Sequence, residues 1–246
     1  MRVKVSIVIP VYNERTLILE IIRRALAAPL PAGMEREVVV IDDGSDDGTG
    51  RLLANTPFPP EVILHTSLLN HGKGGAVRAG FKLARGEVLL IQDGDLEYDP
   101  MENYYKLLEP FEDPAVSIVY GSRFLRLRFP DGMALRNWFA NRILTMTAAT
   151  LFQVRLTDEA TGYKVFRKSV LDHFDLTENG FEFCPEFTAK ALRTGHRIVE
   201  VPVVYRGRNM QQGKKIRARH AFTAMYALVH HRVAPLAKKR PTDPLA

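Results

Sequence analysis

The first 123 residues alternate between short apolar runs and segments with helical periodicity, and this alternation restricts the possible folds strongly. The apolar runs are expected to be strands at residues 3–12, 36–45, 61–67, 87–95 and 115–123. The segments between them are expected to be helices at residues 14–28, 49–54, 72–85 and 101–111. Apolar strands that alternate with helices predict an α/β fold, in which helices cover both faces of a mostly parallel sheet.

Polar clusters follow four of the expected strands. They are Tyr12–Glu14, Asp42–Ser45, Asp93–Glu97 and Gly121–Arg123. In sheets of this kind, ligands bind beyond the carboxyl ends of the strands. The sequence therefore predicts a binding site that is built from these loops.

The third cluster is the most charged. In the stretch VLLIQDGDLEYDP, four carboxylates fall within seven residues, and such crowding requires a positive partner. Asp93 and Asp95 can converge on one cation because Gly94 permits a bend, and their hard oxygens suit Mg²⁺ or Mn²⁺. Glu97 is a possible third ligand. The alternative is a turn or helix start rich in Asp, and we adopt it for Asp99, which is expected to cap the next helix.

Beyond residue 123 the periodicity is less regular. Helices are expected at about 133–153, at 185–193 and at about 217–237, and a strand at 197–208. No helix or strand is assigned to 157–171. There is no internal repeat and no convincing linker, so residues 1–246 are expected to form one domain.

Composition supports a globular chain with an anionic partner. A hydrophobic content of 46% is enough for a sizeable core, and the single cysteine, Cys184, excludes an intramolecular disulfide. No signal peptide and no apolar run of membrane-spanning length is recognised. The formal net charge of +6 is concentrated from Arg193 onward. It suits a phosphate-bearing substrate or a membrane surface. Nucleic acid is not expected as a partner, because no stacking-aromatic or recognition-helix motif is present.

Several motifs resemble one enzyme family. The stretches VSIVIPVYNE, VVVIDDGSDDGT, GKGGAVRAGF and LIQDGDLEYDP resemble the nucleotide-sugar half of a family 2 glycosyltransferase of the GT-A (Rossmann-like) fold. YGSRF, TDEATGYKVFRK, GFEFCPE and GHRIVEVPVVYRGR resemble the dolichol-phosphate mannosyltransferase-like subgroup, the polyprenyl-phosphate glycosyltransferases. The resemblance covers residues 3–217. It implies a nucleotide-sugar half at 1–123, an acceptor half at 124–216, and a C-terminal amphipathic helix with a basic tail at 217–246.

The resemblance also implies roles on the donor side. Asp93, Asp95 and the residue at position 97 would bind the metal that bridges the diphosphate; that third position is commonly Gln in the family and is Glu97 here. The stretch HGKGG does not fit a phosphate-loop pattern, so it is interpreted as a glycine-rich helix start that brings Lys73 near the nucleotide. The further donor-contacting residues are expected to be Pro10, Tyr12, Glu14, Asp42 and Gly94. For Glu14 a simple helix-start role is equally favoured, and Asp43 is the alternative turn-capping residue beside Asp42.

On the acceptor side, Arg123 and Arg136 are expected to grip a lipid phosphate, with a hydrogen bond from Asn141. Asp158 lies where related inverting enzymes carry an acidic base; if the acceptor is a phosphate, Asp158 would instead orient the acceptor or the sugar. Its alternative role is a turn cap. Arg208 and Lys214 resemble the family's mobile basic loop, where they would offset the charge of the leaving diphosphate.

The expected function is therefore metal-dependent, inverting transfer of a hexose from GDP-mannose or a UDP-hexose to a polyprenyl phosphate, on the cytoplasmic face of a membrane. Two alternatives stay open. The acceptor could be a sugar or protein hydroxyl with Asp158 as the base, or the chain could be a silent nucleotide-sugar-binding subunit. The C-terminal helix is expected either to dock on the core or to lie on a membrane surface. Membrane contact would be made by this helix, by the stretch FLRLRF at 124–129, or by a membrane protein.

Overall fold

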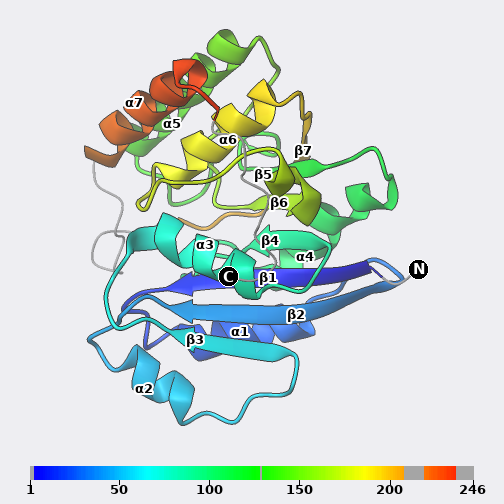
Figure 1. The fold of residues 1–246 in the computed structure, drawn as a ribbon, viewed down its shortest axis with the longest axis vertical. Helices are drawn as coiled ribbons and strands as arrows, with labels where there is room; N and C mark the ends of the chain where they lie inside the picture. Colours follow the sequence, from blue (N-terminus) through cyan, green and yellow to red (C-terminus); the bar gives the residue numbers. More distant parts are fainter. Residues whose placement is uncertain (1–2, 128, 208–218, 237–246) are drawn as a thin grey trace.

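The computed structural model describes residues 3–127, 129–207 and 219–236. These residues form one seven-stranded sheet, in the order β3-β2-β1-β4-β6-β5-β7, with helices on both faces (Figure 1). The strands are β1 (Val3–Val11), β2 (Met34–Asp42), β3 (Val62–Thr66), β4 (Val88–Ile91), β5 (Ile118–Ser122), β6 (Lys164–Arg167) and β7 (Ile198–Pro202). Every strand pair is parallel except the two that β6 makes. The predicted α/β fold with a mostly parallel sheet is confirmed.

The helices largely match the expected segments. They are α1 (Ile18–Ala27), α2 (Thr49–Ala54), α3 (Gly72–Leu83), α4 (Pro100–Leu108), α5 (Leu135–Phe152), α6 (Phe183–Arg193) and α7 (Arg219–Val233). Two short 3-10 turns follow at Glu109–Glu112 and Lys168–Asp172. Asp99 caps α4 as predicted, because its carboxylate accepts the N–H of Met101 at 3.0 Å.

The apolar strands bury both of their faces. Side chains alternate between the faces of a strand, so Ile7 and Ile9 of β1 join the core under α1 and α4, whereas Val8 joins the core under α3 and α6. All three are fully buried. This two-sided burial explains why the strands show no polar alternation. The parallel pairing of β1 to β4 brings the carboxyl ends of these strands together.

Strand β6 was not predicted. It lies within the unassigned segment 157–171 and inserts antiparallel between β4 and β5. Its sequence, KVFR, is short and begins with Lys164, which is fully buried. The amine of Lys164 donates to the carbonyl of Glu159 at 2.8 Å and lies 3.8 Å from the ring centre of Tyr120. A buried lysine breaks the apolar pattern by which a strand is recognised in a sequence, so this strand could not be predicted.

The expected C-terminal helix exists as α7, but its amphipathic character is not confirmed. It packs against the rest of the molecule through Ala224, Ala227 and Leu228, and it lies beside α5 and α6 (Figure 1). Several of its larger apolar residues stay exposed, as do several on α5; they are Phe222, Tyr226, Val229 and Val233 on α7, and Leu135, Phe139, Ile143 and Met146 on α5. None of the helices within the described residues is both long enough and apolar enough to span a bilayer.

Candidate active site

The loops after β1 and β2 are joined by hydrogen bonds beyond the carboxyl ends of these strands. Asn13 adopts a left-handed backbone (φ 52°), its N–H donates to the Ser45 hydroxyl at 2.9 Å, and its side chain exchanges two hydrogen bonds with Asp46. The neighbouring Glu14 uses its carbonyl to accept the N–H of Ile18, the first residue of α1. This contact is made by the backbone of Glu14, so the helix-start role of its carboxylate also stays a prediction. The donor-binding roles of Pro10, Tyr12 and Glu14 stay predictions.

Asp42 and Asp43 have different surroundings at the end of β2. The carboxylate of Asp43 accepts the N–H groups of His71 and Gly72 at 2.9 and 2.8 Å, so it fixes the start of α3. Asp42 accepts the N–H of Ser45 at 3.2 Å, and its other oxygen faces Gly50, where a Cβ would come within 2.3 Å. Asp43 is thus the structural carboxylate of the pair, and Asp42 stays the candidate for donor binding.

The glycines at the start of α3 serve close packing. A Cβ on Gly74 would lie 2.3 Å from the carbonyl oxygen of Glu178, and the Gly74 N–H donates to the carbonyl of Gly180 at 3.2 Å. The helix start is therefore pressed against the loop at 177–180. This packing aims Lys73 at the acidic loop that follows β4.

Lys73 supplies the positive partner that the acidic loop was expected to need. Its amine bonds to a carboxylate oxygen of Asp93 at 2.5 Å, and both side chains are largely buried. Burial opposes the charge on the amine, but the carboxylate of Asp93 raises the pKa of Lys73 above its ordinary value. The other oxygen of Asp93 faces Gly162, where a Cβ would come within 2.4 Å. One carboxylate oxygen of Asp93 thus bonds to the Lys73 amine, and the other packs against the Gly162 backbone.

Gln92, which sequence reasoning missed, fixes the shape of the acidic loop. It is fully buried; its side-chain N–H groups donate to the carbonyls of Asp93 and Tyr98, at 2.9 and 3.2 Å. Its oxygen accepts the hydroxyls of Tyr104 and Tyr163 at 3.1 and 2.8 Å. A polar residue at the end of an apolar strand was the only signal in the sequence that could have identified it.

The three predicted metal ligands do not form a three-carboxylate cluster. Within the described residues, no group of three or more His, Cys, Asp or Glu side chains is arranged to hold a metal ion. Glu97 is 8% exposed, and its carboxylate accepts the hydroxyl of Tyr205 at 2.9 Å. Asp93 and Asp95 remain, and two carboxylates suit Mg²⁺ or Mn²⁺ when phosphate oxygens and water complete the coordination. This donor set fits the ion; metal binding by Asp93 and Asp95 stays a prediction.

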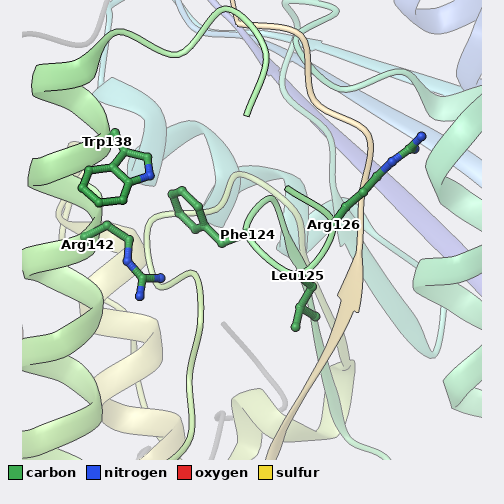
Figure 2. A pocket seen from close by; sticks show the side chains of 5 residues that line it. All are labelled: Phe124, Leu125, Arg126, Trp138 and Arg142. Atoms are coloured by element: carbon green, nitrogen blue, oxygen red, sulfur yellow. The ribbon is translucent and has the colours of Figure 1, made fainter. Parts of the chain in front are cut away.

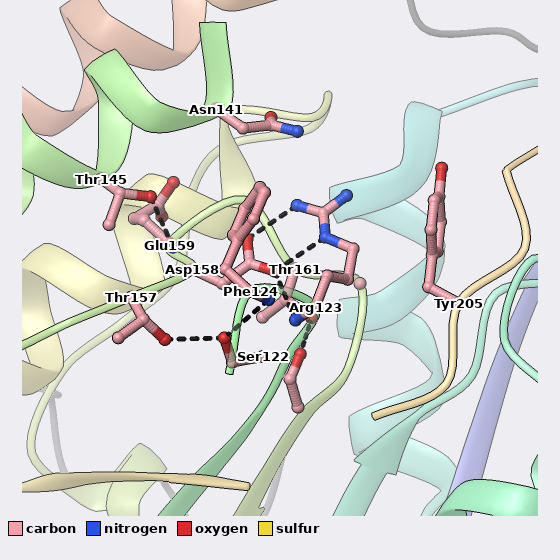
Figure 3. Close-up of polar contacts among 12 residues, drawn as sticks. Ser122, Arg123, Phe124, Asn141, Thr145, Thr157, Asp158, Glu159, Thr161 and Tyr205 are labelled. Carbon is pink, nitrogen blue, oxygen red and sulfur yellow. Dashed lines mark hydrogen bonds and ion pairs between the residues drawn. The ribbon is translucent and has the colours of Figure 1, made fainter. Parts of the chain in front are cut away.

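Arg123 and Asp158 form a buried, bidentate ion pair (Figure 3). The guanidinium donates from Nε and Nη2 to the two oxygens of Asp158, both at 2.7 Å, and the Arg123 backbone N–H adds a third bond at 3.0 Å. Burial opposes the charge, but Asp158 raises the pKa of Arg123 well above its ordinary value. Because both oxygens of Asp158 are engaged and the residue is fully buried, it does not face an acceptor as expected. In this geometry Asp158 holds Arg123.

The other predicted acceptor residues within the described part of the chain, Arg136 and Asn141, lie on α5. Arg136 is exposed on the first turn of α5, and no contact within the described residues joins it to Arg123. Asn141 is half-buried, with its amide nitrogen 3.9 Å from the sulfur of Met133. Arg208 and Lys214 lie outside the described residues. Two guanidinium groups that grip one phosphate need not touch each other, so the Arg123–Arg136 clamp stays a prediction.

Two neighbouring pockets are lined by several arginines, Arg123 included. One, of about 370 Å³, is lined by Arg123, Arg126, Leu127, Pro130, Asp131, Val203, Val204, Tyr205 and Arg206. The other, of about 320 Å³, is lined by Phe124, Leu125, Arg126, Trp138 and Arg142. Figure 2 shows Trp138 and Arg142 projecting from α5 towards Phe124, whose ring centre lies 5.4 Å from the Arg142 guanidinium. Arg126 lines both pockets, so a basic pocket adjoins an aromatic one.

The sequence matches known glycosyltransferases over most of its length. The family model for glycosyl transferase family 2 matches residues 6–174. A dolichol-phosphate mannosyltransferase of Pyrococcus furiosus is 31% identical over 226 residues, which are 87% of this chain and 60% of that protein. An undecaprenyl-phosphate mannosyltransferase of Micrococcus luteus is 34% identical, over 86% of this chain and 87% of that protein. The chain thus spans less than two thirds of the Pyrococcus protein but most of the Micrococcus protein.

Solved structures show the same fold at low identity. Glucosyl-3-phosphoglycerate synthase from Mycobacterium tuberculosis, in complex with Mn²⁺, uridine diphosphate and phosphoglyceric acid, aligns with a TM-score of 0.70 at 17% identity, over 95% of this chain and 80% of that one. Mannosyl-3-phosphoglycerate synthase from Rubrobacter xylanophilus aligns with a TM-score of 0.66 at 19% identity, over 93% and 72%. Together with the family match, this likeness establishes that the chain belongs to glycosyl transferase family 2 and is a glycosyltransferase with the GT-A fold.

Proposed function

We propose that this glycosyltransferase moves a hexose from a nucleotide-diphosphate sugar, GDP-mannose or a UDP-hexose, to a polyprenyl phosphate. The observation that carries the proposal is the pair of adjoining pockets that share Arg126. A polyprenyl phosphate has an anionic head and an apolar chain, so it needs a basic pocket beside an apolar one. The names of the relatives from Pyrococcus and Micrococcus contain this acceptor class, which supports the same assignment.

The donor is assigned to the loops that follow β1, β2 and β4. Asp42 would bind the nucleoside part, and Asp93 and Asp95 would hold a Mg²⁺ or Mn²⁺ ion on the diphosphate. Such an ion neutralises charge on the diphosphate oxygens as the bond to the sugar breaks. Lys73 already bonds to Asp93, so its amine lies beside the place assigned to the diphosphate and could also bind a diphosphate oxygen. Arg208 and Lys214 complete the proposal as further cations for the leaving group.

The acceptor phosphate is assigned to the basic pocket. Arg123 keeps its Nη1 group outside the pair with Asp158, because that pair uses Nε and Nη2. Its guanidinium also lies 5.4 Å from the ring centre of Tyr205 on the pocket wall. A guanidinium N–H forms a strong, charge-assisted hydrogen bond to a phosphate oxygen, and Nη1 would supply it here. Arg136 and Asn141 stay further candidates for this contact.

The proposed reaction is a single displacement with inversion. An oxygen of the lipid phosphate forms a bond to the anomeric carbon, the bond from that carbon to the nucleoside diphosphate breaks, and the electron pair leaves with the diphosphate. Phosphate monoesters are already ionised near neutral pH, so no strong base is required. The engagement of Asp158 by Arg123 is compatible with this reaction and disfavours a hydroxyl acceptor that depends on Asp158 as the base.

Peripheral membrane contact belongs to the same proposal. α5 and α7 lie side by side and leave Phe139 and Ile143, and Phe222 and Tyr226, more than half exposed (Figure 1). The aromatic pocket opens beside α5, since Trp138 and Arg142 of that helix line it. Exposed apolar side chains next to arginines suit the headgroup region of a bilayer. The lipid acceptor would then reach the pocket from the cytoplasmic face of the membrane.

The test is a transfer assay with the full chain. GDP-mannose, UDP-glucose and UDP-N-acetylglucosamine would each be incubated with a short polyprenyl phosphate and Mn²⁺, and the lipid product measured. We expect one donor to give a lipid phosphosugar, and we expect EDTA and Asp95→Ala to abolish the product. Asp113→Asn, at an exposed loop before β5, is the matched control and should keep full activity. No transfer from any of the three donors to the lipid phosphate would overturn the proposal.

A further inference from the structure

Glu200 is a half-buried carboxylate on the edge strand β7, and the reaction proposed above gives it no role. It lies in the middle of β7, beside Tyr120 of β5. One oxygen accepts the N–H of Thr157 at 2.8 Å and the other accepts the N–H of Asp158 at 2.9 Å. Burial and the nearby Asp158 raise the pKa of Glu200, so the fold keeps this carboxylate at a cost.

The peptide that Glu200 holds is also anchored from other sides. The carbonyl of Thr157 accepts a hydrogen bond from Arg142 at 3.3 Å, and its hydroxyl contacts the hydroxyl of Ser122 at 2.6 Å (Figure 3). Asp158, the next residue, carries the bidentate pair with Arg123. The peptide at 157–158 therefore connects one arginine of the basic pocket with one arginine of the aromatic pocket.

We propose that Glu200 is a positioning residue for the acceptor: by holding the 157–158 peptide, it sets Asp158 against Arg123 and so orients the guanidinium that binds the acceptor phosphate. This inference rests on the proposed function for the identity of the acceptor. The orientation of Arg123 itself does not depend on that identity. Glu200 is not expected to touch the donor, because its two oxygens point to the N–H groups of Thr157 and Asp158.

The first test separates acceptor binding from donor binding. In Glu200→Gln one of the two oxygens becomes an amide that meets an N–H donor, so one hydrogen bond is lost and a repulsion is added. We expect the KM for the polyprenyl phosphate to rise about tenfold, while the KM for the donor stays within about twofold. Equal rises in both KM values, or an unchanged acceptor KM, would overturn the proposal.

A matched variant controls for lost stability. Glu37 is also a strand carboxylate that accepts a backbone N–H, that of Arg85, but it lies near the opposite edge of the sheet, beside Ser6. Glu37→Gln should lower the melting temperature without changing the acceptor KM. If it raised the acceptor KM as Glu200→Gln does, the effect would be general destabilisation and the inference would fail.

A second readout is independent of the reaction. The Nε–H signal of Arg123 can be followed in ¹⁵N–¹H spectra and assigned by its loss in Arg123→Lys. We expect Glu200→Gln to shift this signal and Glu37→Gln to leave it in place; an unshifted signal in Glu200→Gln would refute the positioning role. If the wild-type chain transfers sugar to no lipid phosphate, the proposed function fails, and the spectrum alone then decides the role of Glu200.

Discussion

Replacing Asp158 by Asn tests the idea that this carboxylate holds a buried arginine and is not a base. Arg123 is 7% exposed and Asp158 is fully buried, so neither charge can turn to solvent if its partner is removed. The Asn variant keeps one acceptor oxygen but points an amide at the guanidinium. Breaking one side of a buried pair typically costs about 3–5 kcal/mol. Because one acceptor remains, we expect a loss of about 3 kcal/mol in the free energy of unfolding.

Urea unfolding followed by circular dichroism measures that loss directly. In a chain of this size, about 3 kcal/mol corresponds to a fall of about 6–12 °C in melting temperature. The double variant Arg123→Gln/Asp158→Asn removes both charges, so its loss should fall short of the sum of the two single losses by more than about 1 kcal/mol. Strictly additive losses, or a loss below about 1 kcal/mol for Asp158→Asn, would refute the account of a tightly coupled pair.

Three further predictions concern packing, pH and membrane contact. Gly74→Ala should lower the free energy of unfolding by about 1–3 kcal/mol, because its Cβ would meet a backbone oxygen at 2.3 Å, whereas Gly94→Ala, with a nearest contact of 3.5 Å, should stay within about 1 kcal/mol in the same urea titration. Burial opposes ionisation of Glu186, but its bonds to Lys190 and to two backbone N–H groups hold its pKa below the ordinary 4.5. Because the pKa of Glu186 is lower in the folded state, its ionised carboxylate stabilises the fold above about pH 4.5, and this contribution is lost as the pH falls through the lowered pKa. The free energy of unfolding, measured from pH 7 to pH 3, should therefore fall less steeply in Glu186→Gln than in the wild type. Phe139→Asp should reduce sedimentation with anionic phospholipid vesicles several-fold without changing the melting temperature, and unchanged sedimentation would count against α5 as a membrane surface.

The sequence was sufficient to predict the sheet and the polar loops at the carboxyl ends of its strands. Apolar strands must be covered on both faces, and that requirement predicted the parallel sheet and the polar clusters at its carboxyl edge. The expected positive partner for the acidic loop is present as Lys73, twenty residues before Asp93 in the chain. The sheet could be predicted because strand periodicity is a property of neighbouring residues, whereas the charge of the acidic loop showed only that some cation was needed.

The roles of individual side chains could not be predicted in the same way. Asp158 was expected to face substrate because related inverting enzymes carry an acidic base near this place, but its partner here is Arg123, thirty-five residues away. Gln92 accepts the hydroxyl of Tyr163, seventy-one residues away, and Glu200 accepts the N–H of Thr157, more than forty residues away. These pairings depend on which strands become neighbours, and the insertion of β6 between β4 and β5 was itself not predicted.

The same long-range contacts join the loops to which we assign the donor and the acceptor. Tyr98, in the acidic loop, packs on Tyr163 and Tyr205, with ring centres 4.6 and 5.1 Å apart. Tyr205 lines the basic pocket and donates its hydroxyl to Glu97. A glutamine at position 97 could accept that hydroxyl equally well, so this contact does not require the charge. The departure from the family's usual Gln therefore changes the charge beside Asp93 and Asp95, the proposed metal ligands, and preserves the hydrogen bond to Tyr205. We expect its effect in metal preference and not in stability.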